Sequence, residues 1–333
     1  MSLLFQPEPA SQLEVAPAVS YGFSFQGNGG TLFRIYAINL LKVLGTVGIY
    51  YFWLKAKVRG YVYSQTELAG ERFAFHGTGL ELLKGWAKAA VLIVGFVALL
   101  VAVEAALSPE AAEVVGRILG LVFGLFALPI AMVGSRRYRL SRTSWRGIRF
   151  VFRGGVNDLA RQMFRDGFWT GATLGVYYPF MLNNLREFVV RNSAFGNVPF
   201  EYDGKGGALW RIYFFGLVFG ILTLGIYYFW FAAARQRYYW SHTSFAGARF
   251  VSNVTGGGMF RVMAGNAVLL VCTLGLAAPW THVRRMRYLA STLRLEGHLD
   301  LALVTQQIQA ANATGEGLAD MVDTGFFDVD LGV

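Results

Sequence analysis

An internal repeat constrains this chain more than any other feature of its sequence. A short pattern of alternating aromatic or apolar residues, followed by glycine in all but the last copy, begins at Phe23, Phe73, Phe150, Phe200 and Phe250. Successive copies start 50 residues apart, except the second and third, which are 77 apart. Such regular self-similarity indicates that one supersecondary unit is repeated. Each copy predicts a short strand that ends in a turn.

A second motif interrupts the apolar run that follows each strand. Residues 223–230 read TLGIYYFW, and related sequences occur in other units. Threonine and glycine permit a turn, and proline suits the first turn of a new helix. We therefore expect the helices to break at a set of motif residues: Thr46, Gly48, Thr173, Gly175, Pro179, Thr223, Gly225, Thr273, Gly275 and Pro279.

The composition favours a membrane protein over a large soluble core. Hydrophobic residues make up 55% of the 333 positions and charged residues only 15%, whereas soluble domains average about 25% charged residues. Several apolar stretches approach the roughly 20 residues that a membrane helix needs. We expect a mainly α, polytopic membrane protein with five internal repeats of about 50 residues. Each repeat would contain a short FxFxG strand plus a membrane helix or a re-entrant helical hairpin broken at the TLG motif.

The long interval between the second and third units leaves the topology open. It contains an extra hairpin at about 86–134, in which 86–107 and 114–134 are each long enough to cross a membrane. If the other units are built alike, each is a shorter hairpin that turns near the TLG motif. The alternative is six simple spans with successive units inverted.

The chain divides into a single repeat-built membrane domain and two tails. The expected boundaries are 1–22 for the N-terminal tail, 23–297 for the membrane domain and 298–333 for an acidic C-terminal tail. All 30 Lys and Arg residues precede His298, and six acidic residues follow it. The tail is a disordered terminus, or it docks on the basic belt of this protein or on an envelope partner. Anionic membrane lipids are the other expected partners, and nucleic acid is not expected.

Five cations recur in step with the repeat, each eleven residues after the opening phenylalanine. One hypothesis is that they surround a common centre and bind anionic headgroups or an anionic solute. The alternative is that they extend to the membrane interface and fix the depth of each helix. The predicted lipid or ligand contacts are Arg34, Lys84, Arg161, Arg211 and Arg261.

Polar residues also recur five positions further along, inside the apolar runs. They are Asn39, Asp166 and Asn266. A lone carboxylate at such depth suggests that Asp166 takes part in an ion or proton relay. It could instead pair with Arg165 or Arg161.

Catalytic motifs are absent from the sequence. His76, His242, His282 and His298 lie far apart, and no zinc-protease, GxSxG or phosphate-binding loop motif is present. Cys272 is the single cysteine, which excludes an intramolecular disulfide. We therefore expect no enzymatic activity, no metal site and no cofactor.

Four motifs together resemble those of one known family. They are the FxFxG pattern, GGALWRI at 206–212, TLGIYYFW at 223–230 and GEGLADMVDTGFFDVDLG at 315–332. The combination resembles the YjgN-like bacterial inner-membrane proteins, a family defined by a domain of unknown function. The resemblance implies a multi-pass protein of the bacterial inner membrane, and it implies no established activity. Small-solute, anion or lipid transport is the first functional hypothesis. The alternative is a membrane scaffold or regulator that recruits an envelope partner through its acidic tail.

Overall fold

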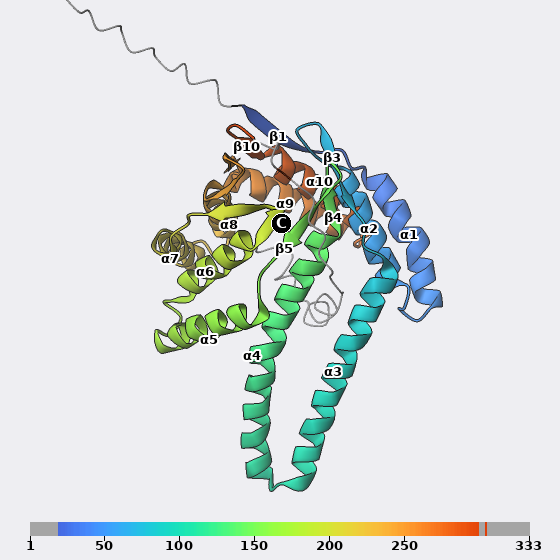
Figure 1. Cartoon of the computed structure of the whole chain (residues 1–333). Helices are drawn as coiled ribbons and strands as arrows, with labels where there is room; N and C mark the ends of the chain where they lie inside the picture. Colours follow the sequence, from blue (N-terminus) through green and yellow to red (C-terminus); the bar gives the residue numbers. More distant parts are fainter. Residues whose placement is uncertain (1–18, 300–303, 305–333) are drawn as a thin grey trace, which may run out of the picture.

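The chain combines a small β-barrel with a set of paired helices. The computed structural model describes residues 19–299 and Val304. Within that part of the chain, each helical pair is followed by short strands that join the barrel. The strands gather in the upper part of Figure 1, and the helices extend away from them.

Each unit contributes two helices and two strands. The first helices of the pairs are α1 (Gly29–Gly45), α3 (Gly79–Ala106), α5 (Val156–Ala172), α7 (Gly206–Leu222) and α9 (Gly256–Cys272). The second helices are α2 (Tyr51–Ser64), α4 (Pro109–Ser141), α6 (Tyr178–Arg191), α8 (Tyr228–Ser241) and α10 (Ala278–Ser291). Short strands follow the second helices: β2 (Thr66–Leu68), β4 (Thr143–Trp145), β6 (Ser193–Phe195), β8 (Thr243–Phe245) and β10 (Leu293–Glu296). The strands that carry the opening phenylalanines are β1 (Ser20–Phe25), β3 (Glu71–Phe75), β5 (Ile148–Phe152), β7 (Val198–Tyr202) and β9 (Ala248–Ser252).

The strands close into a barrel in which every neighbouring pair is antiparallel. The order around the barrel is β1-β10-β9-β8-β7-β6-β5-β4-β3-β2, and β2 pairs with β1 to complete it. Tight turns join most of the hairpins: Ala69 and Gly70 both have positive φ, as a type I′ turn requires. The two ends of the repeat array therefore meet in the sheet, where Tyr21 pairs with Leu295.

Aromatic side chains line the barrel. The opening phenylalanines of neighbouring units contact one another, with ring centroids 6.3 Å apart for Phe150 and Phe200 and 6.4 Å for Phe200 and Phe250. The alternate strands add a second set of buried residues: Leu68, Trp145, Phe195, Phe245 and Leu295. Because side chains on a strand alternate between faces, the repeated pattern places one large apolar side chain per strand inside.

The expectation of a mainly α, polytopic membrane protein is wrong. The described chain is built on a closed ten-stranded barrel. Among the described residues, only α3 and α4 are long and apolar enough to cross a membrane. The other helices have 14 or 17 residues, which at 1.5 Å per residue is at most about 25 Å. The expectation failed because the three-residue strands after the second helices carry too little periodicity to be recognised.

Glycine at the start of a first helix makes the contact between neighbouring units. A Cβ added to Gly256 would lie 2.4 Å from Cγ and 2.7 Å from Cα of Trp230, on the preceding α8. Gly79 meets Trp53 in the same way, and Gly29 meets Trp280 across the closure of the ring. Gly79 and Gly256 need glycine because the backbone of the neighbouring unit approaches so closely, whereas the atoms nearest to Gly29 belong to the Trp280 side chain.

Replacing Gly256 by alanine should therefore destabilise the protein. The added Cβ would overlap backbone as well as side-chain atoms of Trp230, and overpacking of this kind costs about 1–3 kcal/mol. Gly257, the next residue, has nothing within 4 Å of an added Cβ, so Gly257→Ala is a matched control expected to be neutral or stabilising. Thermal unfolding in detergent measures the difference; equal melting temperatures for the two variants would contradict the packing argument.

Candidate functional site

The five predicted cations lie at one repeated position and are exposed. Each occurs on the first helix of its pair, one to two turns from the end nearest the barrel. Arg161 makes an ion pair of 3.4 Å with Asp158, and both side chains face outward. The cations thus form an exposed set at one repeated position, and binding of a lipid or an anion by them stays a prediction. We call Arg34, Lys84, Arg161, Arg211 and Arg261 the outer cation belt.

The TLG residues lie in the turns between the paired helices. The Thr223 hydroxyl donates to the carbonyl of Phe219, 2.6 Å away, and accepts from the N–H of Tyr227, 2.9 Å away. One side chain therefore ends α7 and begins the turn into α8. Equivalent bonds are made by Thr46, Thr173 and Thr273. Pro179 and Pro279 lie in the first turn of the second helices.

The residue after each of these threonines is a fully exposed aliphatic side chain with positive φ. Val47, Leu174, Leu224 and Leu274 are 93–96% exposed, and their φ angles are 49–50°. A left-handed conformation costs an L-residue roughly 1–2 kcal/mol, and nothing in the described structure covers these side chains. Repetition of a costly, exposed apolar residue indicates a contact outside the folded chain. We call these four residues the hairpin tips.

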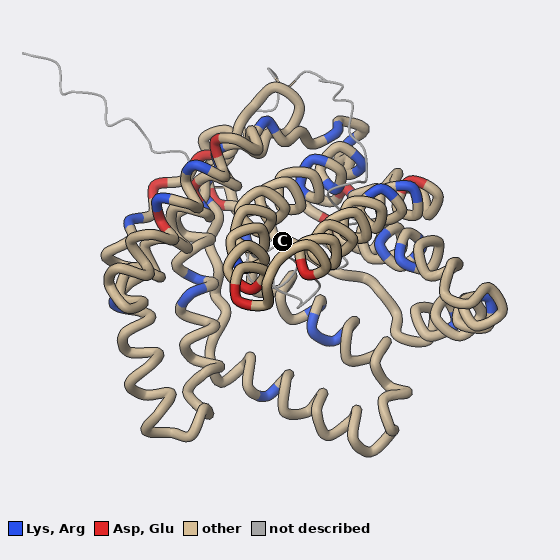
Figure 2. Tube along the Cα trace, turned by 90° about the horizontal axis from the view of Figure 1, so that it is seen from below, with Lys and Arg blue, Asp and Glu red and all other residues tan. Residues whose placement is uncertain are grey.

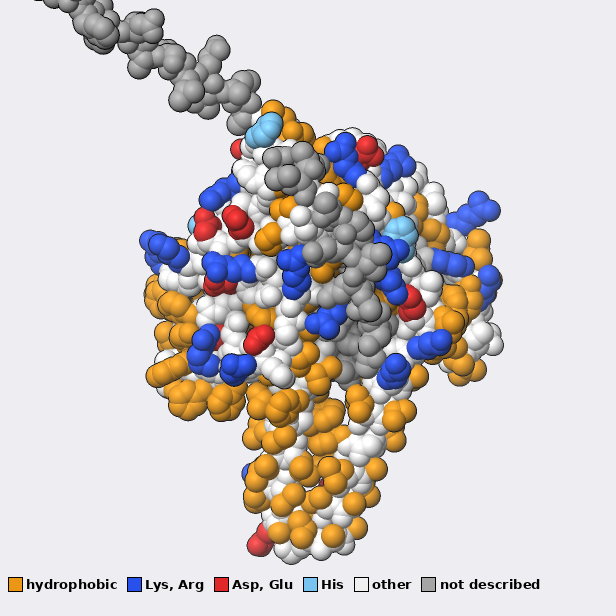
Figure 3. Space-filling model, viewed as in Figure 1, with side chains coloured by type: hydrophobic (Ala, Val, Ile, Leu, Met, Phe, Trp, Pro, Cys, Tyr) orange, Lys and Arg blue, Asp and Glu red, His pale blue; other side chains and the backbone are white. Residues whose placement is uncertain are grey.

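The hairpin tips lie in stretches without Asp, Glu, Lys or Arg. The uncharged segments are 43–54, 167–185, 212–234 and 262–283. Seen from below, several hairpins end in such stretches (Figure 2). Hydrophobic side chains also cover the protruding α3–α4 hairpin, whereas Lys and Arg gather over the body (Figure 3). Charge and apolar surface are therefore separated along the helix direction.

The number of residues between the belt cation and the hairpin tip is the same in all four short hairpins. In each short hairpin the belt cation and the tip are 13 residues apart, which corresponds to about 20 Å along a helix. From Lys84 to Leu107, at the end of α3, there are 23 residues, or about 35 Å. The shorter length is about that of one leaflet of a bilayer, and the length of α3 beyond Lys84 is about that of the whole hydrocarbon core of about 30 Å.

Asp166 is 1% exposed and bridges the two helices of its own hairpin. Its Oδ1 accepts from Arg165 Nε and its Oδ2 from Asn184 Nδ2, each at 3.0 Å. Asn39 and Asn266 make similar bridges, to Lys57 and to the carbonyl of Thr281. Such interhelical hydrogen bonds satisfy buried polar groups. The relay role of Asp166 stays a prediction, and the geometry favours a role in positioning Arg165 and Asn184.

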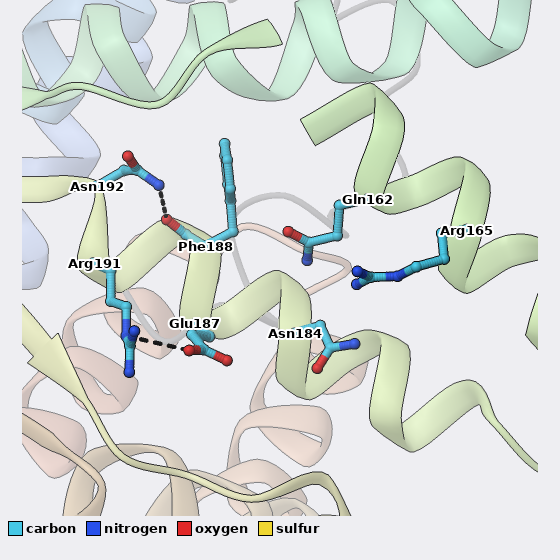
Figure 4. A pocket seen from close by; sticks show the side chains of 7 residues that line it. All are labelled: Gln162, Arg165, Asn184, Glu187, Phe188, Arg191 and Asn192. Carbon is cyan, nitrogen blue, oxygen red and sulfur yellow. Dashed lines mark hydrogen bonds and ion pairs between the residues drawn. The ribbon is translucent and has the colours of Figure 1, made fainter. Parts of the chain in front are cut away.

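A polar pocket opens beside this bridge, between α5 and α6. Its volume is about 340 Å³. Figure 4 shows Gln162 and Arg165 extending from α5 towards Asn184 and Glu187 on α6. The hydrogen bond and charge attraction to Asp166 raise the pKa of Arg165, which therefore stays cationic. The remaining lining residues are Phe188, Arg191 and Asn192.

Arg186, on α6, is a buried cation. It is 2% exposed, and its guanidinium carbon lies 5.4 Å from the rings of both Tyr239 and Trp240 on α8. Burial lowers its pKa from the ordinary value, but an arginine remains protonated in proteins. Arg136 is buried at the same repeated position. Stacking on aromatic faces stabilises a guanidinium in such a place.

The part of the chain that the structure describes contains no cluster of three or more His, Cys, Asp and Glu side chains able to hold a metal ion. The predicted acidic tail lies outside the described residues, apart from its first two positions and Val304. Cys272 is exposed at the end of α9. Sequence reasoning named Arg165 only as a possible partner of Asp166 and missed the other pocket residues. Their signal was that α5 and α6 carry polar residues where the α7–α8 unit has Ile212, Phe215 and Ala234.

Comparison with known proteins identifies relatives without an assigned activity. The inner membrane protein YjgN of Escherichia coli O157:H7 is 31% identical over 133 residues, which cover 40% of this chain and 31% of that protein. The protein of the same name from Salmonella typhimurium is 31% identical over 145 residues, covering 42% and 33%. The chain thus spans about a third of the length of the curated relatives it matches. No solved structure matches it.

A family model covers nearly all of the described repeat array. The model described as "Bacterial protein of unknown function (DUF898)" matches residues 20–220, 197–251 and 231–321. These segments overlap and include every strand and helix of the barrel and its hairpins. The chain therefore belongs to the DUF898 family of bacterial proteins of unknown function, as its resemblance to the YjgN-like proteins predicted.

Proposed function

We propose that this chain is an integral protein of the bacterial inner membrane that binds phospholipids and takes part in lipid handling. In this proposal α3 and α4 cross the bilayer, the four hairpin tips enter the apolar layer of the near leaflet, and the outer cation belt contacts anionic headgroups. The barrel then lies outside the bilayer. No catalytic step is part of the proposal.

The constant spacing between belt and tip carries this proposal. An apolar tip about 20 Å along the helix from each belt cation and a hairpin about 35 Å long are comparable in length with one leaflet and a whole bilayer. The names of the curated relatives add independent support, since both are described as inner membrane proteins. Exposed apolar patches rimmed by charge commonly mark membrane contacts.

Lipid contact is favoured over passage of a solute along the axis. The belt cations are exposed on the first helices, where lipid headgroups could contact them. The barrel is lined by aromatic rings, including Phe150, Phe195 and Phe245, that contact one another. A path for an anion would need polar groups at this position, so a lipid is the better-supported ligand class.

Replacing Arg34, Arg161, Arg211 and Arg261 together by glutamine should reduce the anionic phospholipid retained by the purified protein. A cation near an anionic membrane surface contributes about 1 kcal/mol, so each loss should weaken local lipid binding about fivefold. Lipid extraction followed by quantitative mass spectrometry measures the retained phosphatidylglycerol per protein.

The control replaces Arg72 and Arg294 by glutamine, because both are exposed on the barrel strands β3 and β10. Retained lipid should equal that of the unmodified protein. If the four belt substitutions left the lipid content unchanged, lipid binding by the belt would be excluded.

A second candidate function is recruitment of an envelope protein by the acidic tail. Six acidic residues and no Lys or Arg follow His298, so the segment would suit a basic partner surface. This proposal concerns residues beyond those described. Crosslinking of the full chain and of a chain ending at residue 311 distinguishes it, since the same partners in both would exclude recruitment by the tail.

A further inference from the structure

We infer that the pocket between α5 and α6 binds the zwitterionic headgroup of a phosphoethanolamine-type phospholipid. The inference rests on the proposed membrane contact, and it adds a specific site to the general belt of cations. Its basis is the set of charged and polar groups that face one space in the hairpin formed by α5 and α6.

The pocket presents both signs of charge at separate places. Arg165 reaches it from α5, and its Nε is fixed on the buried carboxylate of Asp166 at 3.0 Å. Glu187 and Arg191 lie on α6 and form an ion pair of 3.2 Å. A phosphate would find donors in Arg165, Asn184 and Gln162 on one side. A primary ammonium would find the Glu187 carboxylate on the other.

Glu187 decides between a zwitterion and a simple anion. A carboxylate at the edge of a site for phosphate or another anion would repel that ligand, and a headgroup carrying its own ammonium removes this repulsion. A trimethylated amine cannot donate the hydrogen bonds that a primary ammonium can donate to a carboxylate. The pocket should therefore prefer phosphoethanolamine to phosphocholine.

The fold itself does not require these polar residues. The α7–α8 hairpin has the same construction 50 positions later, and its groove of about 410 Å³ is lined by Ile212, Phe215 and Ala234. These residues stand where α5–α6 has Gln162, Arg165 and Asn184. Gly216 replaces the buried Asp166. One hairpin thus folds with an apolar groove, and the polar groove of the other needs a different explanation.

The apolar surface beside the pocket suits the acyl chains of the same lipid. Trp169 lies one turn beyond Arg165 on the same side of α5, since residues four apart share a helix face, and it is partly exposed. Phe168 packs against it with ring centroids 5.6 Å apart. Towards the tip, Leu174 is exposed as well. A headgroup in the pocket would direct its chains along this surface into the leaflet.

The test is binding of lipids to the full chain in detergent, measured by native mass spectrometry. Phosphatidylethanolamine should bind roughly tenfold more tightly than phosphatidylcholine, because only its primary ammonium can donate a hydrogen bond to the Glu187 carboxylate. Glu187→Gln should remove this preference and leave phosphate binding intact. Arg165→Gln should weaken both lipids. Arg72→Gln, at an exposed position on the barrel strand β3 outside both grooves, is the control and should leave the preference unchanged.

Two further measurements separate failure of the site from failure of the membrane proposal. Glycerophosphoethanolamine has no acyl chains, so its competition with phosphatidylethanolamine for the pocket in detergent does not depend on how the protein lies in a bilayer. It should compete well, and inorganic phosphate should compete less well. Circular dichroism checks folding, and Glu187→Gln removes only an exposed ion pair, so it should fold normally. Equal binding of the two lipids, or a preference that survives Glu187→Gln, would overturn the inference. Loss of lipid binding by the outer cation belt alone would not contradict the inference about the pocket.

Discussion

Replacing Val94 and Val97 by aspartate should prevent the α3–α4 hairpin from crossing the membrane. The two side chains are 67% and 51% exposed and lie 10 and 13 residues beyond Lys84, about 15–20 Å into the bilayer. A charged residue at that depth costs about 2.5–3.5 kcal/mol, so the pair opposes insertion by about 5–7 kcal/mol. A cysteine introduced by Ala111→Cys at the far end of the hairpin, in a Cys272→Ser background, reports the topology through a membrane-impermeant maleimide.

The matched control places aspartates at Leu107 and Val114, which are 42% and 56% exposed and lie close to the turn between the helices. Their cost should be small because the turn would lie at the opposite interface, next to Glu110 and Glu113. In the parent and in the control, the Ala111→Cys and Arg294→Cys sites should react from opposite sides of the membrane. If the Val94/Val97 variant gave the same pattern, the hairpin would not depend on lipid and the crossing would be refuted.

Sequence reasoning identified the repeat, its cations and the strands that carry the opening phenylalanines, but not the second strand of each hairpin or the closure of the barrel. The recurrence of the opening phenylalanines at 50-residue intervals depends only on counting. The second strand of each hairpin, such as Thr66–Leu68, has three residues, too few for an alternating pattern to differ from chance. Closure of a barrel also depends on pairing between Tyr21 and Leu295, and no local pattern predicts a contact between residues so far apart.

The sequence does not show which helix face is exposed, so the positions of the site residues could be predicted only in part. The in-step cations were recognisable because charge is rare in this chain, yet the sequence could not distinguish an inner ring from an outer belt. A helix turns 100° per residue, so that choice depends on which face of each first helix packs, and Gly79 and Gly256 determine it by meeting tryptophans of the neighbouring unit. Arg186 is the opposite case, because this cation is buried against Tyr239 and Trp240.

The sequence contains a signal for the α5–α6 pocket. Alignment of the units at an interval of 50 shows Arg165 opposite Phe215 and Asn184 opposite Ala234. What the sequence alone could not supply is that these two residues and Asp166 meet, because Asn184 lies 18 residues beyond Asp166 across the hairpin turn. A difference between copies of a repeat becomes interpretable as a site only once the copies are placed in space.

Replacing Phe195 by alanine should strongly destabilise the barrel. The side chain is 2% exposed and contacts the rings of Trp145, Phe150 and Phe245 at 5.4, 5.0 and 5.9 Å. Loss of a buried phenylalanine typically costs 3–5 kcal/mol, and edge-to-face ring contacts add to the burial term. Because β6 has only three residues, its pairing with β5 and β7 relies on this side chain. Chemical denaturation in detergent, followed by tryptophan fluorescence, measures the change.

Phe164→Ala provides the comparison, since Phe164 is 62% exposed on α5 and its removal leaves no internal cavity. Its unfolding midpoint should match that of the parent. Phe195→Leu should fall between the two because it keeps an apolar side chain but loses the ring contacts. A small effect of Phe195→Ala, similar to that of Phe164→Ala, would mean that the aromatic lining does not hold the strands together. The closure of the array would then depend on the helix contacts alone, with glycines such as Gly256 as its main determinants.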